Sequence, residues 1–195
     1  MKNNFSKYQG LGNDFIIFDA RCNNLDHLFS KNKDNFIEHL CNRNFGIGAD
    51  GIILILESNN KCFVRMKIYN SDGSEPEMCG NGIRCLIAFL NDNNEINELS
   101  EIPIETKAGL ILTSIDGNEN IKVNMGEPIL SPLDIPTKLL MNSLKVPNGV
   151  ITLKDQILNV YAASMGNPHM IVFVEKIDNI PFEEWGRFLE KHNTF

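Results

Sequence analysis

One predicted helix constrains the fold of this chain more than any other feature. Residues 83–91, IRCLIAFLN, are apolar on nearly every face of a helix. Such a helix packs inside a domain, because it has no polar face to turn toward water. The preceding stretch, NSDGSEPEMCGNG at residues 70–82, is made of turn-forming residues. We therefore expect a glycine-rich loop that leads directly into a central, buried helix.

Apolar stretches on both sides of this helix predict the strands around it. Residues 62–70 alternate apolar and basic side chains with the period of two that a half-buried strand shows. Asp116 and Gly117 stand between alternating apolar residues and predict a hairpin. Other strands are expected at 5–9, 15–20, 51–57, 101–107, 150–164 and 169–177, and amphipathic helices at 34–43 and 181–192.

The stretch between Gly126 and Gly149 predicts a domain boundary. It contains four prolines and little periodicity, which is typical of a connection between domains. We place the domains at residues 1–125 and 126–195. The second region is about half as long and contains no counterpart of the apolar helix, so we expect the second domain to be incomplete.

Composition argues against several classes of protein. The net charge of −7 comes without long runs of like charge, which does not favour binding to nucleic acid or to a membrane surface. The apolar runs are too short to span a bilayer, and we expect a cytoplasmic protein. The five cysteines form no CxxC pair and the four histidines no HxxxH pair, so we expect free thiols in a reducing compartment and no metal site.

Cys79 stands where the glycine-rich loop meets the helix. The first turn of a helix has unpaired N–H groups and about half a positive charge, which together stabilise an anion such as a thiolate. The thiolate is the reactive form, so Cys79 is a candidate nucleophile or general base. Gly80 and Gly82 would let a ligand approach the backbone, and Asn81 offers hydrogen bonds. The alternative is a small apolar residue that only caps the helix.

The other cysteines and the histidine near residue 170 point less clearly to chemistry. His169 follows Asn167 and Pro168 at the start of a predicted strand, where a histidine is either structural or close to a site. Core positions are expected for Cys41, Cys62 and Cys85, and a loop position for Cys22.

Several motifs together resemble diaminopimelate epimerases, which are cofactor-independent amino-acid racemases of lysine biosynthesis. The matching stretches are KYQGLGNDFIIFDA, RNFGIGADGI, YNSDGSEPEMCGNGIRC, ETKAG and MGNPHMIVFVE. The resemblance implies an α/β (α+β) fold of two similar domains, each with a mixed, mostly antiparallel sheet wrapped around a central helix. It further implies a substrate held between the domains, one catalytic cysteine from each domain, no pyridoxal phosphate or metal, and a homodimer.

The resemblance also implies roles for individual residues. Cys79 corresponds to the first catalytic cysteine, which exchanges a proton with the α-carbon of diaminopimelate. His169 corresponds to a histidine that tunes the acidity of the catalytic cysteines. The positions that match substrate-binding residues of the family are Asn13, Asn70, Gly80, Asn81 and Asn167.

The chain departs from the family pattern in four respects. The family's second catalytic cysteine, in a CGTGA-like motif, and the ERG-like segment before it have no counterpart, and we expect the chain to stop at Phe195 before reaching them. Tyr8 stands where many members have methionine, and Gly51 where some have a substrate-binding glutamine. Two alternatives stay open: a related isomerase of the proline racemase, hydroxyproline racemase or phenazine-biosynthesis type, and a truncated, noncatalytic binding remnant.

Overall fold

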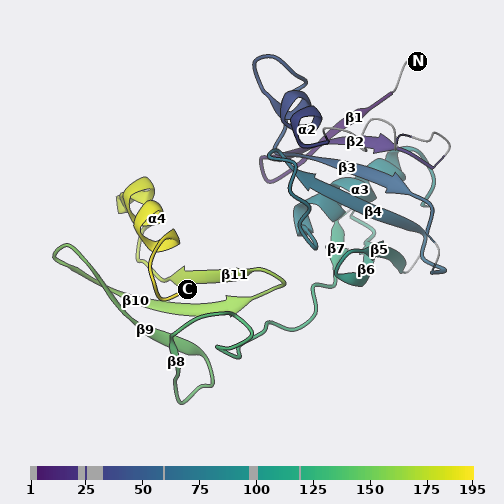
Figure 1. Cartoon of the computed structure of the whole chain (residues 1–195). Helices are drawn as coiled ribbons and strands as arrows, with labels where there is room; N and C mark the ends of the chain where they lie inside the picture. The colour runs from purple at the N-terminus through teal and green to yellow at the C-terminus, as the bar shows by residue number, and fades with distance from the viewer. Residues whose placement is uncertain (1–3, 22–24, 26–32, 59, 97–100, 119) are drawn as a thin grey trace. The chain divides into compact units, whose positions relative to one another are not determined.

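The chain forms two β-sheets, each with its own hydrophobic core. The computed structural model describes residues 4–21, 25, 33–58, 60–96, 101–118 and 120–195. Contacts divide the chain into two units, Met1–Met125 and Gly126–Phe195, which Figure 1 shows in purple to teal and in green to yellow.

The first unit is a mixed sheet with a helix on each face. Its strands are β1 (Ser6–Gly10), β2 (Asn13–Asp19), β3 (Gly51–Leu56), β4 (Val64–Asn70), β5 (Ile102–Thr106), β6 (Gly109–Ile115) and β7 (Ile121–Val123), and its helices are α2 (Lys33–Cys41) and α3 (Gly80–Asp92). The strands follow one another in chain order across the sheet. β2 pairs with β3 and β4 with β5 in parallel, and the other neighbours are antiparallel.

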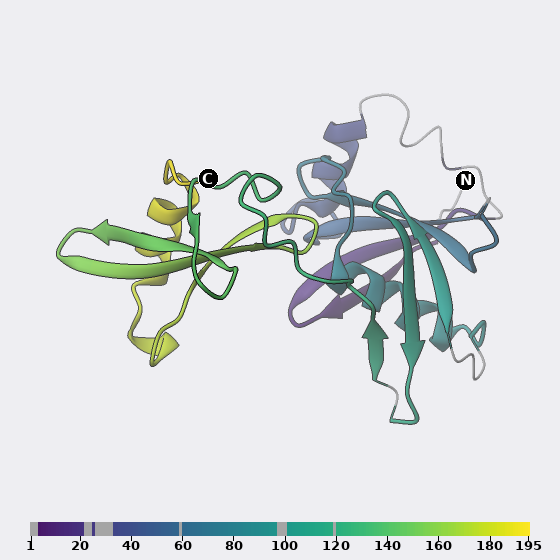
Figure 2. The ribbon, with the colours of Figure 1, turned by 90° about the horizontal axis from the view of Figure 1, so that it is seen from below.

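Helix α3 is the centre of the first unit. Ile83, Leu86, Ile87 and Leu90 are fully buried and pack against inward-facing side chains of β2, β3, β4 and β5. The two edge strands, β1 and β7, both contact α3, so the sheet curls around the helix, as Figure 2 shows. The expected central helix inside a mixed, mostly antiparallel sheet is therefore confirmed, together with the α+β fold class.

Helix α2 covers the opposite face of the same sheet. Its side chains Ile37 and Cys41 are buried against Ile16 and Ile52, which alternate along β2 and β3 with residues that face α3. The predicted amphipathic helix is confirmed. Because both faces of β3 are covered, the strand is apolar along its length and reads GIILIL.

The second unit is an antiparallel sheet with a helix on one face. Its elements are β8 (Leu140–Met141), β9 (Pro147–Leu153), β10 (Gln156–Ser164), β11 (Pro168–Val172), a 3-10 helix η1 (Ile177–Asn179) and α4 (Phe182–Glu190). The strands lie in the order β11-β10-β9-β8. Leu158 and Val160 of β10 are buried, and Trp185 and Leu189 of α4 pack against their cluster.

The other face of the second sheet carries exposed apolar side chains. Alternation along β9 and β10 places Val150 and Ile157 on this face, where they are 62% and 71% exposed. Phe173, just after β11, is 78% exposed, and its ring meets the edge of Tyr161 with the ring centroids 5.4 Å apart. No helix of the described residues covers these side chains, in contrast to both faces of the first sheet.

In the structure, one local expectation is wrong, one hairpin is confirmed with a longer loop than expected, and one strand was not predicted. Cys62 was expected in the core, but it lies ahead of β4 and is only half-buried, with Sγ 3.7 Å from the carbonyl oxygen of Asn60. The hairpin at Asp116 is confirmed, although its loop is five residues long rather than the two of a tight turn. Strand β8 was missed because two residues carry no periodicity. Cys22 lies outside the described residues.

Within the described ranges, no helix is long and apolar enough to cross a membrane.

Candidate functional site

The sheet register gathers the predicted site residues of the first unit at one end of its sheet. Asn13 begins β2, Gly51 begins the parallel strand β3, and Asn70 ends β4 as the pairing partner of Gly51. Gly10, which pairs with Asn13, lies beside the first turn of α3: a Cβ on Gly10 would be 3.6 Å from the carbonyl oxygen of Asn81. Four strands, β1 to β4, and the start of α3 therefore converge here.

Cys79 is the N-cap residue of α3. Its backbone is extended, with φ −142° and ψ 114°, and its Sγ accepts a hydrogen bond from the N–H of Gly82 across 3.4 Å. The side chain is half-buried and packs against the cluster around α3. Cys79 thus caps the helix, and the same geometry places its sulfur at the positive end of the helix dipole.

Gly80 and Asn81 form the first turn of α3, where backbone N–H groups have no acceptor within the helix. Close to Gly80, the thioether of Met125 would lie 3.4 Å from an added Cβ. The side-chain oxygen of Asn81 accepts a hydrogen bond from Nη2 of Arg84 across 2.8 Å. This turn therefore offers both backbone and side-chain donors to an anion.

Gly82 has a different role from the one expected. It is buried, and a Cβ there would lie 2.9 Å from Cδ1 of Ile68 and 3.5 Å from Cδ1 of Ile53. The glycine is explained by close packing of the helix start against β3 and β4, and not by room for a ligand.

Asn70 is exposed at the end of β4, and the loop that follows orients it. Its Nδ2 donates to Oγ of Ser74 across 2.9 Å, and the carboxylate of Asp72 accepts from both the N–H and the hydroxyl of Ser74. These bonds to Ser74 lower the pKa of Asp72. With Nδ2 engaged, Oδ1 of Asn70 is the atom left to accept a hydrogen bond from a ligand.

A cluster of charged residues beside Asn13 was missed by the sequence reasoning. We call Lys7, Asp14, Arg43 and Asp50 the ion cluster. Asp14 accepts from Arg43 across 2.7 Å and from Lys7 across 3.0 Å, and Arg43 also reaches Asp50 across 2.9 Å. Arg43 first, and Lys7 with it, hold the pKa of the Asp14 carboxyl well below its usual range. The residues of the ion cluster come from separate segments that show no shared periodicity. In the sequence, only the position of Asp14 next to Asn13 could have indicated the ion cluster.

The backbone at Gly51 leaves no space for a side chain. A Cβ there would overlap the carbonyl oxygen of Tyr69 and meet the ring of Phe15 at 3.2 Å. Any side chain at this position would therefore need a shift of the backbone.

Asn167 and His169, the other two predicted site residues, belong to the second unit. Asn167 lies in the turn between β10 and β11, directly after Gly166, which has φ +109°. The first unit also has an asparagine directly after a glycine with positive φ, namely Asn13 after Gly12 (φ +84°). His169 is exposed and pairs with Ala163.

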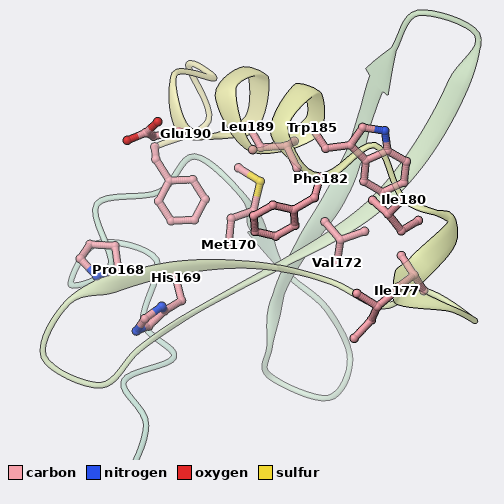
Figure 3. Close-up of a pocket in the computed structure, with 13 residues that line it drawn as sticks. Pro168, His169, Met170, Val172, Ile177, Ile180, Phe182, Trp185, Leu189 and Glu190 are labelled. Carbon is pink, nitrogen blue, oxygen red and sulfur yellow. The ribbon is translucent and has the colours of Figure 1, made fainter. Parts of the chain in front are cut away.

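An apolar cleft of about 640 Å³ lies between β11 and α4 of the second unit. Figure 3 shows Met170 reaching toward Leu189 and Trp185 of α4, whereas the imidazole of His169 lies on the other side of β11. His169 therefore stands at the border of the cleft and on the exposed face of the sheet, where a polar group is accessible.

The described cysteines and acidic residues form no metal centre. Cys41, Cys62, Cys79 and Cys85 are free thiols, and no group of three or more metal-ligating side chains is found within the described residues. Burial first, and then nearby negative charges, raise the pKa of Cys41 and of Cys85 to about 11 each. These two thiols stay protonated at neutral pH.

Comparison with known proteins assigns the family. The sequence profile described as diaminopimelate epimerase matches residues 5–131. The chain belongs to the diaminopimelate epimerase family. It is 96% identical to the diaminopimelate epimerase of Prochlorococcus marinus strain NATL2A, over the whole of this chain and 69% of that protein. It is 45% identical to diaminopimelate epimerase 1 of Nostoc sp. PCC 7120, over 98% of this chain and 67% of that one.

Solved structures at low sequence identity share the fold of this chain. A phenazine biosynthesis protein of the PhzF family from Bacillus anthracis superposes with a TM-score of 0.55 at 21% identity, covering 90% of this chain and 56% of its own. A hydroxyproline epimerase from Agrobacterium vitis gives 0.58 at 13% identity, with 93% and 52% covered. The motif region that contains Cys79 lies inside the matched family profile, and Asn167 and His169 lie beyond it.

Proposed function

We propose that this protein is a diaminopimelate epimerase, which interconverts LL- and meso-diaminopimelate in lysine biosynthesis by moving the proton on one α-carbon. The observation that carries the proposal is 96% identity along the whole chain to a diaminopimelate epimerase. The cysteine at the N-terminus of the central helix adds support, because it supplies an acid/base group at an anion-binding position.

In the proposed reaction, Cys79 is one of two acid/base groups. Its thiolate takes the α-proton, so a thiol forms and the electron pair of the C–H bond stays on carbon. A proton returned to the same face restores the substrate, and a proton delivered to the opposite face inverts the centre. Protons and electrons balance without an oxidant or a reductant.

The first turn of α3 is proposed to hold the α-carboxylate of the substrate. The α-proton of an amino acid is weakly acidic, so the developing carbanion needs donors that are already in place. The N–H groups of Gly80 and Asn81 and the helix dipole supply positive potential there without a group that titrates.

Uncharged amides are proposed to hold the polar ends of the substrate. The oxygen of Asn70 suits an ammonium group, because its Nδ2 is already engaged by Ser74. The amide of Asn13 makes no hydrogen bond with a described residue and can turn to either kind of group. We propose Asn167 as a further contact and His169 as the residue that tunes the acidity of the thiols.

The group on the opposite face is the second part of the proposed mechanism. No CGTGA-like motif occurs in the sequence, so none of the motifs matched here supplies a second cysteine. We expect exchange of the α-proton to depend on Cys79, because this thiol serves one face of the α-carbon in the proposal, whichever group serves the other face.

The test follows both events in deuterated water. LL-diaminopimelate is incubated with the reduced protein, with α-deuterium uptake measured by mass spectrometry and inversion by chiral chromatography. We expect uptake that disappears in Cys79→Ala, while Cys62→Ala, which replaces another half-buried thiol, retains it. Absence of exchange in the parent protein, or exchange that survives Cys79→Ala, contradicts the proposal. Inversion as fast as uptake would mean that another group of this chain serves the opposite face.

We also propose a cytoplasmic location and a homodimer. The free thiols of the described cysteines suit a reducing compartment, and the homodimer is what the family resemblance implies.

A further inference from the structure

Arg84 fixes which atom of the Asn81 amide faces the site. Its Nη2 donates to Oδ1 of Asn81 across 2.8 Å, between residues three apart on one face of α3. A guanidinium carries only donors, so the atom of the amide that faces it must be the oxygen. The two N–H donors on Nδ2 are thereby turned away from Arg84 and left for a ligand.

Gly10 makes room for this guanidinium. A Cβ on Gly10 would lie 3.3 Å from Nη2 of Arg84, which is closer than ordinary side-chain contacts, and 3.7 Å from Cβ of Asn81. Gly10 is not among the residues with positive φ, so its backbone does not demand glycine. A side chain at Gly10 would require the guanidinium of Arg84 to move by a few tenths of an ångström.

Among the described residues, no carboxylate forms an ion pair with Arg84. Arg21 and Arg43 each contact two carboxylates, whereas Arg84 pairs with none in the described part of the chain. Arg84 is half-buried, so water screens it only in part. A positive charge of this kind beside the first turn of α3 adds to the attraction for an anion.

We propose that Arg84 is a positioning residue: it locks the Asn81 amide with Nδ2 toward the carboxylate of the substrate, and Gly10 leaves the space that this requires. The inference rests on the proposed function for the identity of the anion. The orientation of the amide does not depend on it.

The first test measures binding of LL-diaminopimelate by isothermal titration calorimetry. Arg84→Met keeps the length of the side chain without donors, and we expect it to weaken binding roughly tenfold, the effect of losing one hydrogen bond and one charge. Arg84→Lys, which also carries only donors and keeps the positive charge, should recover most of this loss. Gly10→Ala should weaken binding by displacing the guanidinium, and should add little in the Arg84→Met background. Thermal unfolding of each variant checks that the fold is kept.

The second test needs no substrate. The Nδ2 resonances of Asn81, assigned in ¹H–¹⁵N spectra by comparison with Asn81→Asp, should shift in Arg84→Met and in Gly10→Ala and stay near the parent position in Arg84→Lys. Unchanged resonances in Arg84→Met overturn the inference, whatever the protein binds. Equal losses of binding in Arg84→Lys and Arg84→Met, or additive losses from Gly10→Ala and Arg84→Met, also overturn it. Shifted resonances in a protein that does not bind diaminopimelate would contradict the proposed function and support the positioning role.

Discussion

Asp14 joins three segments of the first unit through one carboxylate. It accepts hydrogen bonds from Lys7 on β1, from Arg43 after α2, and from the backbone N–H of Asp50 ahead of β3. The side chain is only 14% exposed, so these bonds are screened less than those of a surface ion pair. The folded protein therefore favours the ionised carboxyl, and its pKa is lowered.

We expect Asp14→Asn to lower the free energy of unfolding by about 2 kcal/mol at pH 7, the cost of losing a charged hydrogen-bond partner. The cost should shrink as the pH falls from 4 toward 2. A carboxyl with a lowered pKa in the folded state stabilises above its unfolded pKa, ordinarily 3.8, and loses that contribution as the pH falls through the folded value. Urea unfolding across this pH range measures the difference.

Asp50→Asn is the matched control for Asp14→Asn. Asp50 contacts the same Arg43, but its side chain is 46% exposed, so the cost should stay below about 1 kcal/mol. A cost at Asp14 that is the same at pH 7 and at pH 2 would contradict the assigned cause.

Single residues divide into those that sequence could assign and those that it could not. Cys79 was predicted at the start of a helix, because glycines and an apolar run are local signals, and the structure places it there. No role was predicted for Arg84, which stands inside the apolar run. Its proximity to Gly10 joins α3 to β1 and is not visible in the sequence. Cys62 was assigned to the core by alternation, yet the strand begins two residues later.

The loop after β4 and the helix α2 approach each other through a glycine. Gly73 is buried with φ +82°, and a Cβ there would lie 2.7 Å from Cα of Asp34 in the first turn of α2. The backbone of Gly73 also donates to the carbonyl oxygen of Asn70. The position of the proposed substrate contact thus depends on how closely these two elements pack.

We expect Gly73→Ala to destabilise the protein by about 2 to 4 kcal/mol, because the new Cβ adds a clash with helix backbone to the strain of a positive φ. Gly12→Ala is the matched control: Gly12 has φ +84° and nothing within 4 Å of an added Cβ, so only about 1 kcal/mol of strain is expected. Denaturant unfolding compares them, and equal costs would show that the contact with α2 contributes nothing.

Helices and strands were predicted well where the sequence shows hydrophobic periodicity. Contacts between residues of different elements were not predicted. The strands of the first unit, α3 and α4 all follow local patterns. The approach of Gly73 to α2 and the burial of Gly82 against Ile68 join residues from different elements, and a period carries no information on such contacts.

At the scale of the whole molecule, the two sheets differ in what covers them. Helices α2 and α3 cover the two faces of the first sheet. The second sheet has α4 on one face, and Val150, Ile157 and Phe173 stand exposed on the other. Exposed apolar patches on soluble proteins bind hydrophobic ligands or other proteins.

We expect this face to bind the dye 1-anilinonaphthalene-8-sulfonate and to drive concentration-dependent association. Replacing both Ile157 and Phe173 with serine should reduce dye fluorescence and shift sedimentation-velocity profiles toward smaller species, because it removes apolar area from water-exposed surface. The control replaces Leu133 and Leu144, which are 91% and 80% exposed in the same unit but lie outside the sheet. Equal effects of the two pairs would show that the sheet face has no special role.

The sequence by itself determined the central helix, most strands, the α+β class and the family, because hydrophobic period, turn residues and ordered motifs are properties of adjacent residues. Only the tertiary structure decided that Asp14 meets Arg43, that Arg84 crosses Gly10 and orients Asn81, and that one face of the second sheet is exposed. These features depend on strand register and on the packing of segments distant in the chain. The folded geometry determines which side chains from different elements come into contact.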